Sequence, residues 1–291
     1  MRNHDAEPSA SMHQRAELFA GLHRRGDPLL LANAWDVASA VAIASAGAQA
    51  IATTSAGVAW SLGVPDGADF GADRAAAVIR RIAAAVTVPV SADIEAGYGE
   101  SPGTVAATLA AVVRAGAVGV NIEDQRDQSS LFEPGEQAER LAAARAAAGG
   151  IPVWINARTD VFLCGSYSST SAGVAAALRR AAQYAGAGAD SLFVPGLTDL
   201  AAIAELAAGP LPVTVMAGPG AATVAELTTA GVVRISLGSA VAQAAYGLAA
   251  RAATELFTTG TYDSSTNGFS YTSMNNALQT ATVTGKEAPA R

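Results

Sequence analysis

The stretch Val88-Pro-Val-Ser-Ala-Asp-Ile-Glu-Ala-Gly-Tyr-Gly99 begins as a strand and ends in a glycine-rich turn. Its first residues are two β-branched valines around a proline, which is tolerated where a strand starts. Side chains alternate across a strand, so Asp93 and Glu95 lie on one face at its end. Two carboxylates on one face are costly unless a cation lies between them. This stretch therefore predicts either a divalent metal site or two solvated acids at a strand end.

Similar β-like runs alternate along the chain with alanine-rich segments of helical length. Several segments end in an Ala-Gly pair, which is typical of a helix C-terminus, just before the next run. Eight runs alternating with helices predict an α/β fold, a single-domain (β/α)8 TIM barrel. A doubly wound open sheet is the alternative, but the chain lacks a dinucleotide-type glycine fingerprint. The runs are 29–35, 50–55, 88–94, 119–124, 153–160, 191–196, 212–218 and 234–238.

The chain length of 291 residues fits one such domain, since these barrels usually need about 250 residues. Residues 1–14 are polar and predict a flexible arm. Residues 15–262 would form the catalytic barrel with its C-terminal helix, in which the alanine-rich stretch 241–257 suits packing between subunits. Residues 263–291 are rich in Ser, Thr, Asn and Gly and predict a polar tail, with its last ten or so residues disordered.

Composition excludes several classes of function. The formal net charge of −7 argues against nucleic acid and anionic membranes as partners. The N-terminus lacks the apolar core of a signal peptide, and no apolar run is suited to span a bilayer, so we expect a cytoplasmic protein. One cysteine, Cys164, excludes an internal disulfide framework and a cysteine zinc site.

The distribution of histidine and lysine restricts the chemistry further. The three histidines lie within the first 23 residues, and the single lysine is Lys286. The barrel therefore offers no lysine for a Schiff base, and a histidine only if the N-terminal arm folds over the site. Carboxylates, arginines and hydroxyls remain, and such oxygen ligands suit Mg²⁺ or Mn²⁺.

In a (β/α)8 barrel the active site lies at the carboxyl ends of the strands, and the polar residues of this chain collect there. Arg158 could serve the site or be ion-paired with Asp160 or Asp93, and Asp36 could be only a helix cap. Long loops at 60–73 and 125–135 would bind substrate or form lids. The polar strand-end residues are Asn33, Asp36, Thr53, Thr54, Ser55, Asp93, Glu95, Asn121, Glu123, Asp124, Asn156, Arg158 and Asp160.

Motifs distributed over about residues 29–260 carry a family resemblance. They are Thr53-Thr-Ser-Ala-Gly-Val-Ala59, Leu62-Gly-Val-Pro-Asp66, Asp93-Ile-Glu-Ala-Gly-Tyr-Gly99, Asn121-Ile-Glu-Asp124, Asn156-Ala-Arg-Thr-Asp160 and Ala187-Gly-Ala-Asp-Ser-Leu-Phe193. In this order and at barrel spacing, the chain resembles the isocitrate lyase/phosphoenolpyruvate mutase superfamily. The resemblance implies a Mg²⁺-dependent enzyme that breaks or forms a C–C or P–C bond in a small 2-oxo or 2-hydroxy acid.

The resemblance also implies roles for individual residues. Asp93 would hold the metal, with Glu95 and Glu123 assisting, often through water. Arg158 would contact the substrate and stabilise a developing enolate, a charge that a chelated metal would also offset. The remaining residues implied are Asp66 at the metal or substrate; Thr54, Ser55, Ala56 and Gly57 on the substrate carboxylate; and Tyr98 as a hinge or a polar contact. The candidates for the group that handles the proton are Tyr98, Ser129, Ser130 and a metal-bound water.

One departure from the superfamily pattern selects among its branches. Where the isocitrate and methylisocitrate lyases carry Lys-(Lys/Arg)-Cys-Gly-His, this chain has Gln125-Arg-Asp-Gln-Ser-Ser130. Those two activities are therefore not expected. The phosphonate enzymes carry a lysine and an asparagine on this loop. This chain has neither of them there, and its one basic residue on the loop is Arg126. The chain is most similar to the oxaloacetate decarboxylase-like and carboxyphosphonoenolpyruvate mutase-like branch.

Three functions follow as hypotheses. The first is a Mg²⁺-dependent C–C lyase of the oxaloacetate decarboxylase or alkylmalate lyase type. The second is P–C bond chemistry, as in a phosphonomutase or phosphonopyruvate hydrolase. The third is a metal-dependent 2-oxo-acid binding protein without turnover. The resemblance further implies a homo-oligomer, a dimer of dimers in which the last helix is exchanged between subunits.

Overall fold

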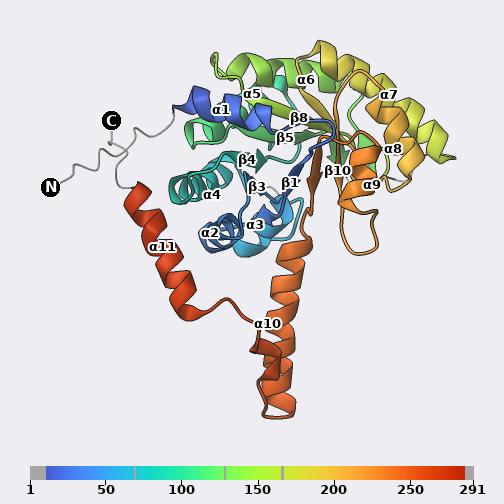
Figure 1. Ribbon diagram of the computed structural model, residues 1–291. Helices are drawn as coiled ribbons and strands as arrows, with labels where there is room; N and C mark the ends of the chain where they lie inside the picture. Colours follow the sequence, from blue (N-terminus) through green and yellow to red (C-terminus); the bar gives the residue numbers. More distant parts are fainter. Residues whose placement is uncertain (1–10, 69, 128, 165–166, 286–291) are drawn as a thin grey trace.

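The computed structural model describes residues 11–68, 70–127, 129–164 and 167–285. Its centre is one parallel sheet with the strand order β1-β11-β10-β9-β8-β5-β4-β3-β2 (Figure 1). The strands are β1 (Leu29–Leu31), β2 (Asn33–Ala34), β3 (Ile51–Thr53), β4 (Val90–Asp93), β5 (Gly119–Glu123), β8 (Trp154–Arg158), β9 (Ser191–Phe193), β10 (Val213–Met216) and β11 (Arg234–Ser236).

The sheet closes into a barrel through its first run. Strands β1 and β2 both come from residues 29–34, with a break at Ala32. β1 pairs with β11, and β2 pairs with β3, so one run joins both edges of the sheet. The eight predicted runs thus form nine strands, and the predicted TIM barrel is confirmed as a nearly closed parallel barrel with flanking helices.

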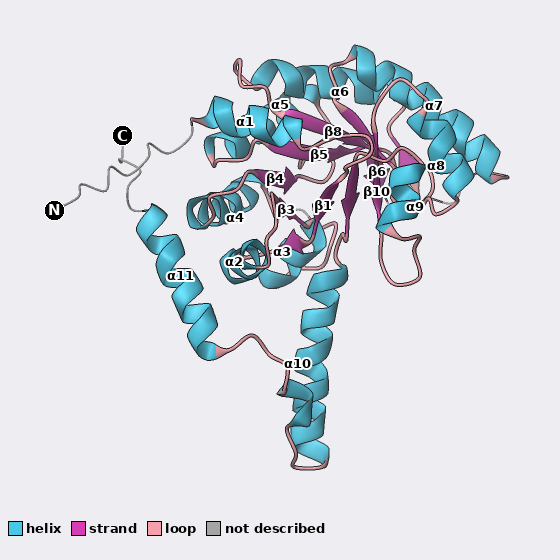
Figure 2. Cartoon of the chain, in the orientation of Figure 1, coloured by secondary structure: helices cyan, strands magenta, loops and turns pink. Residues whose placement is uncertain are grey.

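Helices cover the outside of the sheet (Figure 2). They are α2 (Val37–Ser45), α3 (Ser55–Ser61), α4 (Ala72–Ala85), α5 (Pro102–Arg114), α6 (Pro134–Ala147), α7 (Thr170–Gly186), α8 (Leu200–Ala207) and α9 (Val224–Thr229). The predicted C-terminal glycines of four helices take a left-handed φ, for example 97° at Gly47 and 108° at Gly116. Apolar residues of β4, β5 and β8 pack against α5, α6 and α7 in the largest apolar cluster.

Helix α1 (Met12–Gly21) lies at the amino ends of the strands. Its Phe19 is fully buried and packs with Leu29, Leu31 and Val118. His23, which follows the helix, stacks on Trp154 with ring centroids 4.0 Å apart. The helix begins inside the arm predicted for residues 1–14, of which 1–10 lie outside the described residues. His23 therefore lies at the end of the barrel opposite the strand-end acids.

The C-terminal segment differs from the sequence prediction. Helix α10 (Ala240–Thr258) matches the expected alanine-rich helix and projects away from the barrel (Figure 1). A 3-10 turn (Asp263–Ser265) follows, and α11 (Tyr271–Gly285) then packs against α2 and α4. The prediction of a polar tail from residue 263 missed this helix. Within the described residues, no helix is both long enough and apolar enough to cross a membrane.

Candidate active site at the carboxyl ends of the strands

Three neighbouring strands bring the central charged groups together. Asp93 ends β4, Glu123 ends β5 and Arg158 ends β8. The register pairs Asp93 with Asn121 and Glu123 with Arg158, so the three side chains stand at one rim of the barrel. The structure thus brings Asp93, Glu123 and Arg158 together at the strand ends, as the sequence predicts.

Arg158 is held by two carboxylates. Its Nη1 lies 2.7 Å from an oxygen of Glu123, and its Nε and Nη2 donate to the two oxygens of Asp160 at 2.6 and 2.7 Å. Burial alone would lower the pKa of Arg158, but Glu123 and Asp160 outweigh burial and raise it above its ordinary value. The guanidinium is therefore a permanent cation, and the fork to Asp160 fixes its plane.

The acids of the site outnumber its buried cations, because Arg234 is the second of these and acts on Asp93 from inside the barrel. Burial raises the pKa of Glu123 well above its usual 4.5, although the nearby Arg158 lowers it. The neighbouring acids Asp160, Asp93 and Glu95 raise the pKa further. Burial and the neighbouring Asp93 also raise the pKa of Asp66. A cation bound between these carboxylates would stabilise their charged forms and lower their pKa values again. Such clusters of perturbed groups in a cleft mark candidate functional sites.

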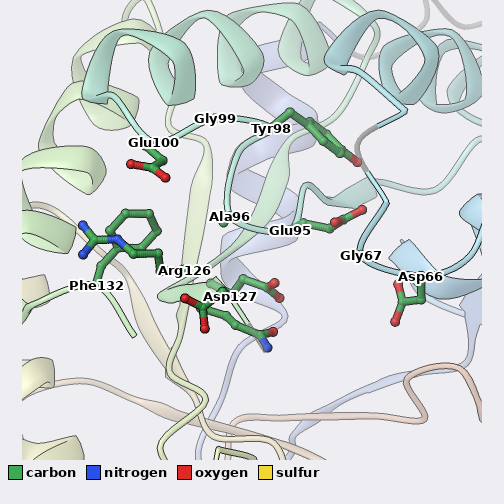
Figure 3. Close-up of a pocket in the computed structure, with 12 residues that line it drawn as sticks. Asp66, Gly67, Glu95, Ala96, Tyr98, Gly99, Glu100, Arg126, Asp127 and Phe132 are labelled. Carbon is green, nitrogen blue, oxygen red and sulfur yellow. The ribbon is translucent and has the colours of Figure 1, made fainter. Parts of the chain in front are cut away.

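The acids open into a cavity of about 620 Å³ (Figure 3). Four predicted site residues, Asp66, Glu95, Tyr98 and Glu123, line it. Arg126 and Phe132 stand together at one side, and Asp66 at the other. The full lining is Asp66, Gly67, Glu95, Ala96, Tyr98, Gly99, Glu100, Glu123, Gln125, Arg126, Asp127 and Phe132.

Asp93 lies beside the cavity residues and is oriented by main-chain donors. One carboxylate oxygen accepts from the Ser55 amide at 3.3 Å, and the other accepts from the Glu95 amide at 3.3 Å. The Asp93 amide donates to the Thr53 hydroxyl at 2.9 Å. These bonds leave carboxylate lone pairs for a further ligand.

The predicted substrate-carboxylate residues form the start of α3. Thr54 precedes the helix, and Ser55, Ala56 and Gly57 are its buried first residues. Through the Ser55 amide they adjoin Asp93, but none of them lines the cavity. Their predicted contact with a substrate stays a prediction.

The donor set suits a hard divalent cation. Among the described residues, no three acidic, histidine or cysteine side chains are arranged so that they could hold a metal ion by themselves. Glu123 is engaged by Arg158. Of the other two predicted ligands, Glu95 lines the cavity and Asp93 lies beside it. Mg²⁺ commonly takes one or two carboxylates and completes its coordination with waters and substrate oxygens, so this set fits it. The ligand roles predicted for Asp93, Glu95 and Glu123 stay predictions.

Several polar and aromatic residues at the strand ends and in the loops have a structural role. Asp36 and Asp199 cap α2 and α8. Trp60 lies by a separate hollow with Gln243 and Tyr246, not by the acid cavity. Asp124 is fully buried, and Arg180 at 3.0 Å and Tyr184 at 2.8 Å donate to its carboxylate.

Two buried polar residues of α6 were not identified from the sequence. Gln137 donates to the main-chain oxygen of Glu123 at 3.1 Å. Arg140 donates to main-chain oxygens of the turn that carries Glu95. The sequence places both on an ordinary helix, and main-chain partners have no signature in a sequence.

Known proteins resemble the chain along most of its length. The family model for phosphoenolpyruvate phosphomutase matches residues 19–257. An uncharacterised protein of Mycobacterium tuberculosis is 39% identical over 81% of this chain and 87% of its own. The 2-methylisocitrate lyase of Escherichia coli K12 is 32% identical over 68% of this chain and 67% of its own. An oxaloacetate decarboxylase of Rhodopseudomonas palustris is 32% identical over 54% of each chain.

Solved structures show the same fold. A candidate lyase or mutase of Burkholderia cenocepacia J2315 is 38% identical, covers 92% of this chain and 97% of its own, and gives a TM-score of 0.84. A phosphonopyruvate hydrolase solved with oxalate and Mg²⁺ is 21% identical, covers 91% of this chain and 95% of its own, and gives a TM-score of 0.78. The family match over most of the barrel identifies this chain as a member of the phosphoenolpyruvate phosphomutase family.

Proposed function

We propose that the chain is a Mg²⁺-dependent lyase that cleaves a C–C bond next to the carbonyl or carbinol of a small 2-oxo or 2-hydroxy dicarboxylic acid. The observation that carries this proposal is the surplus of carboxylates around one fixed guanidinium, Arg158, at the mouth of the barrel. Lyases and mutases among the relatives support it at the level of the superfamily.

Asp93 and Glu95 would hold the metal, with Glu123 beside them. When bound, Mg²⁺ would supply positive charge next to the oxygen that becomes negative as the C–C bond breaks. It would also bind the chelating oxygens of a 2-oxo or 2-hydroxy acid, which accounts for the small number of protein ligands. A substrate without such paired oxygens would be a poor ligand.

Arg158 would stabilise the same developing charge from the protein side. A guanidinium has five N–H donors, and the bonds to Glu123 and Asp160 use three of them. We assign a remaining donor to the substrate oxygen. Because Asp160 fixes the plane of the guanidinium, the donor is oriented before the substrate arrives.

The experiment that tests this function is a screen of oxaloacetate and alkylmalates with Mg²⁺, carried out in parallel on the wild type and Asp93→Ala. We expect turnover of a member of this class by the wild type and its loss in the variant, with the fold retained in circular dichroism. An Asp93→Ala protein that turns over at the wild-type rate would contradict the metal role of Asp93.

P–C bond chemistry is the second candidate. It is supported by Arg126, which lines the cavity on the loop where phosphonate enzymes carry a lysine. Its guanidinium pairs with Glu136 and stacks on Phe132, with 4.5 Å from its central carbon to the ring centroid. Phosphorus NMR of phosphonopyruvate incubated with the protein and Mg²⁺ would show a new signal if this candidate is correct. A protein that binds oxalate with Mg²⁺ but converts neither class of substrate would instead be a binding protein.

A further inference from the structure

The turn after β4 has a costly backbone conformation. Glu95 and Tyr98 have left-handed φ values of 51° and 55°, and Gly97 between them has a φ of 90°. For a residue other than glycine this conformation is unfavourable, because Cβ comes close to the following carbonyl oxygen. The turn nevertheless places both Glu95 and Tyr98 at the cavity (Figure 3). Contacts outside the turn must therefore hold it in place.

Arg140 supplies most of these contacts. Its side chain is fully buried, and it donates to the main-chain oxygens of Ala96, Gly99 and Glu100, with 3.0 Å to Gly99. Its Nε donates to the side-chain oxygen of Gln137 at 2.9 Å. The planar fork of one guanidinium thus engages three carbonyls of one turn and the Gln137 side chain. A lysine has only three donors for these four acceptors, and an apolar side chain has none.

Two further carbonyls of the turn accept hydrogen bonds from other parts of the barrel. The Glu95 oxygen accepts from the Glu123 amide at 3.0 Å, and the Gly97 oxygen accepts from the Thr108 hydroxyl at 2.9 Å. Gln137 donates at 3.1 Å to the main-chain oxygen of Glu123. Through Gln137 and Arg140, helix α6 therefore links the end of β5 to the turn after β4.

This arrangement exceeds what core packing requires. A guanidinium taken fully out of water carries a large desolvation cost, and apolar residues of similar volume commonly replace buried ions without loss of stability. Arg140 also stacks on Phe132, 3.9 Å from its central carbon to the ring centroid, and Phe132 lines the cavity. Every partner of the guanidinium thus belongs to the cavity wall or to α6 itself.

We propose that Arg140, supported by Gln137, is a positioning residue that fixes the 95–100 turn so that Glu95 and Tyr98 face the cavity. The predicted effect of Arg140 on metal binding rests on the function proposed above, whereas its predicted effect on the conformation of the turn does not. Residues that orient metal ligands typically contribute about 10- to 100-fold to metal affinity. We expect an effect of that size from Arg140.

The test compares Arg140→Met with Arg145→Met. Arg145 is a matched control because it lies on the same helix and also binds main-chain oxygens, those of Gly188 at 3.0 Å and Val153 at 2.6 Å, near the opposite end of the barrel. Hydrogen exchange would be followed in peptides covering residues 94–100, and the binding of Mg²⁺ with oxalate would be measured by calorimetry. Gln137→Met and Arg140→Lys serve as milder variants if Arg140→Met does not fold.

The expected result is exchange at residues 94–100 at least about tenfold faster in Arg140→Met, with binding of Mg²⁺ and oxalate about 10- to 100-fold weaker. Arg145→Met should leave both unchanged even where it lowers thermal stability. Wild-type exchange at residues 94–100 in the Arg140 variants would overturn the proposal. If the wild type binds neither Mg²⁺ nor oxalate, the proposed function fails, and the exchange measurement still decides the role of Arg140.

Discussion

Arg158 shows how far one residue depends on its neighbours. Its guanidinium is oriented by Asp160 and balanced by Glu123, so its position is set before any ligand binds. A bidentate contact of this kind has no equivalent in lysine, whose ammonium is a point charge. Charge alone would therefore not preserve the function assigned to this side chain.

We accordingly predict that Arg158→Lys lowers kcat/KM by about 100-fold or more, the loss seen when one donor to a developing oxyanion is removed. Steady-state kinetics on the substrate found in the screen would measure it. Arg145→Lys, remote from the cavity, should stay close to the wild type. Near wild-type kinetics in Arg158→Lys would exclude a donor role for the guanidinium.

His23 gives a pH dependence that is independent of the active site. Burial and the nearby Arg234 lower its pKa from 6.5 to about 3. The unfolded chain therefore binds a proton on His23 near pH 6.5, whereas the folded chain stays neutral there. Stability is full above pH 6.5 and falls as the pH drops toward 3.

We predict that His23 alone costs about 1 kcal/mol of unfolding free energy per pH unit below pH 6.5. Urea unfolding of the wild type and of His23→Phe would be measured at about pH 7 and about pH 5.5. The His23 contribution is the difference between the two proteins in the slope of unfolding free energy against pH. Equal slopes would mean that His23 titrates normally in the folded protein.

At the scale of elements, α1 seals the amino end of the barrel. The first residue of β5, Gly119, faces Phe19, and a Cβ added there would lie 2.4 Å from the Phe19 ring. Because the ring is fully buried and packed on all sides, it has little room to move away. The glycine is thus required by the close approach of α1.

Gly119→Ala should destabilise the fold by about 1–3 kcal/mol, the usual cost of overpacking a core. Urea unfolding would measure the change, and calorimetry should show oxalate binding unaltered, since the substitution lies at the end of the barrel away from the acids. A stability equal to that of the wild type would show that α1 can move away without cost.

The elements also show what the sequence can predict. The eight runs were recognisable because β-branched stretches alternate with alanine-rich segments ended by glycine. Helix α11 was missed because Ser, Thr and Asn dominate its segment, and it is held by α2 and α4 rather than by its own propensity. In the site, the strand-end acids and Arg158 could be predicted from alternation. Arg140 and Arg180 could not, because a buried arginine on a helix looks like a surface arginine until its partners are known.

At the scale of the whole molecule, α10 extends away from the barrel. In this 19-residue helix Ala242 alone is buried, and Phe257 near its end is 82% exposed. Large exposed apolar side chains on a projecting helix are typical of an interface between subunits. The dimer of dimers with an exchanged last helix stays a prediction.

We predict that sedimentation gives about four times the chain mass of 29.0 kDa and that Phe257→Glu gives a smaller assembly. A charge placed at that position would oppose burial of the helix against a second copy. Val224→Glu, at a 45% exposed apolar position on α9, serves as the control outside the projecting helix. A monomeric wild type would contradict the prediction.

The central claim is that the strand-end acids form a site for a divalent cation with a 2-oxo-acid-like ligand. Calorimetric titration of the metal-stripped protein with oxalate, with and without Mg²⁺, tests it most directly. The account predicts binding only when Mg²⁺ is present, and its loss in Asp93→Ala. Absence of binding under both conditions would contradict the account and leave the chain with the fold of its family but without the proposed metal site.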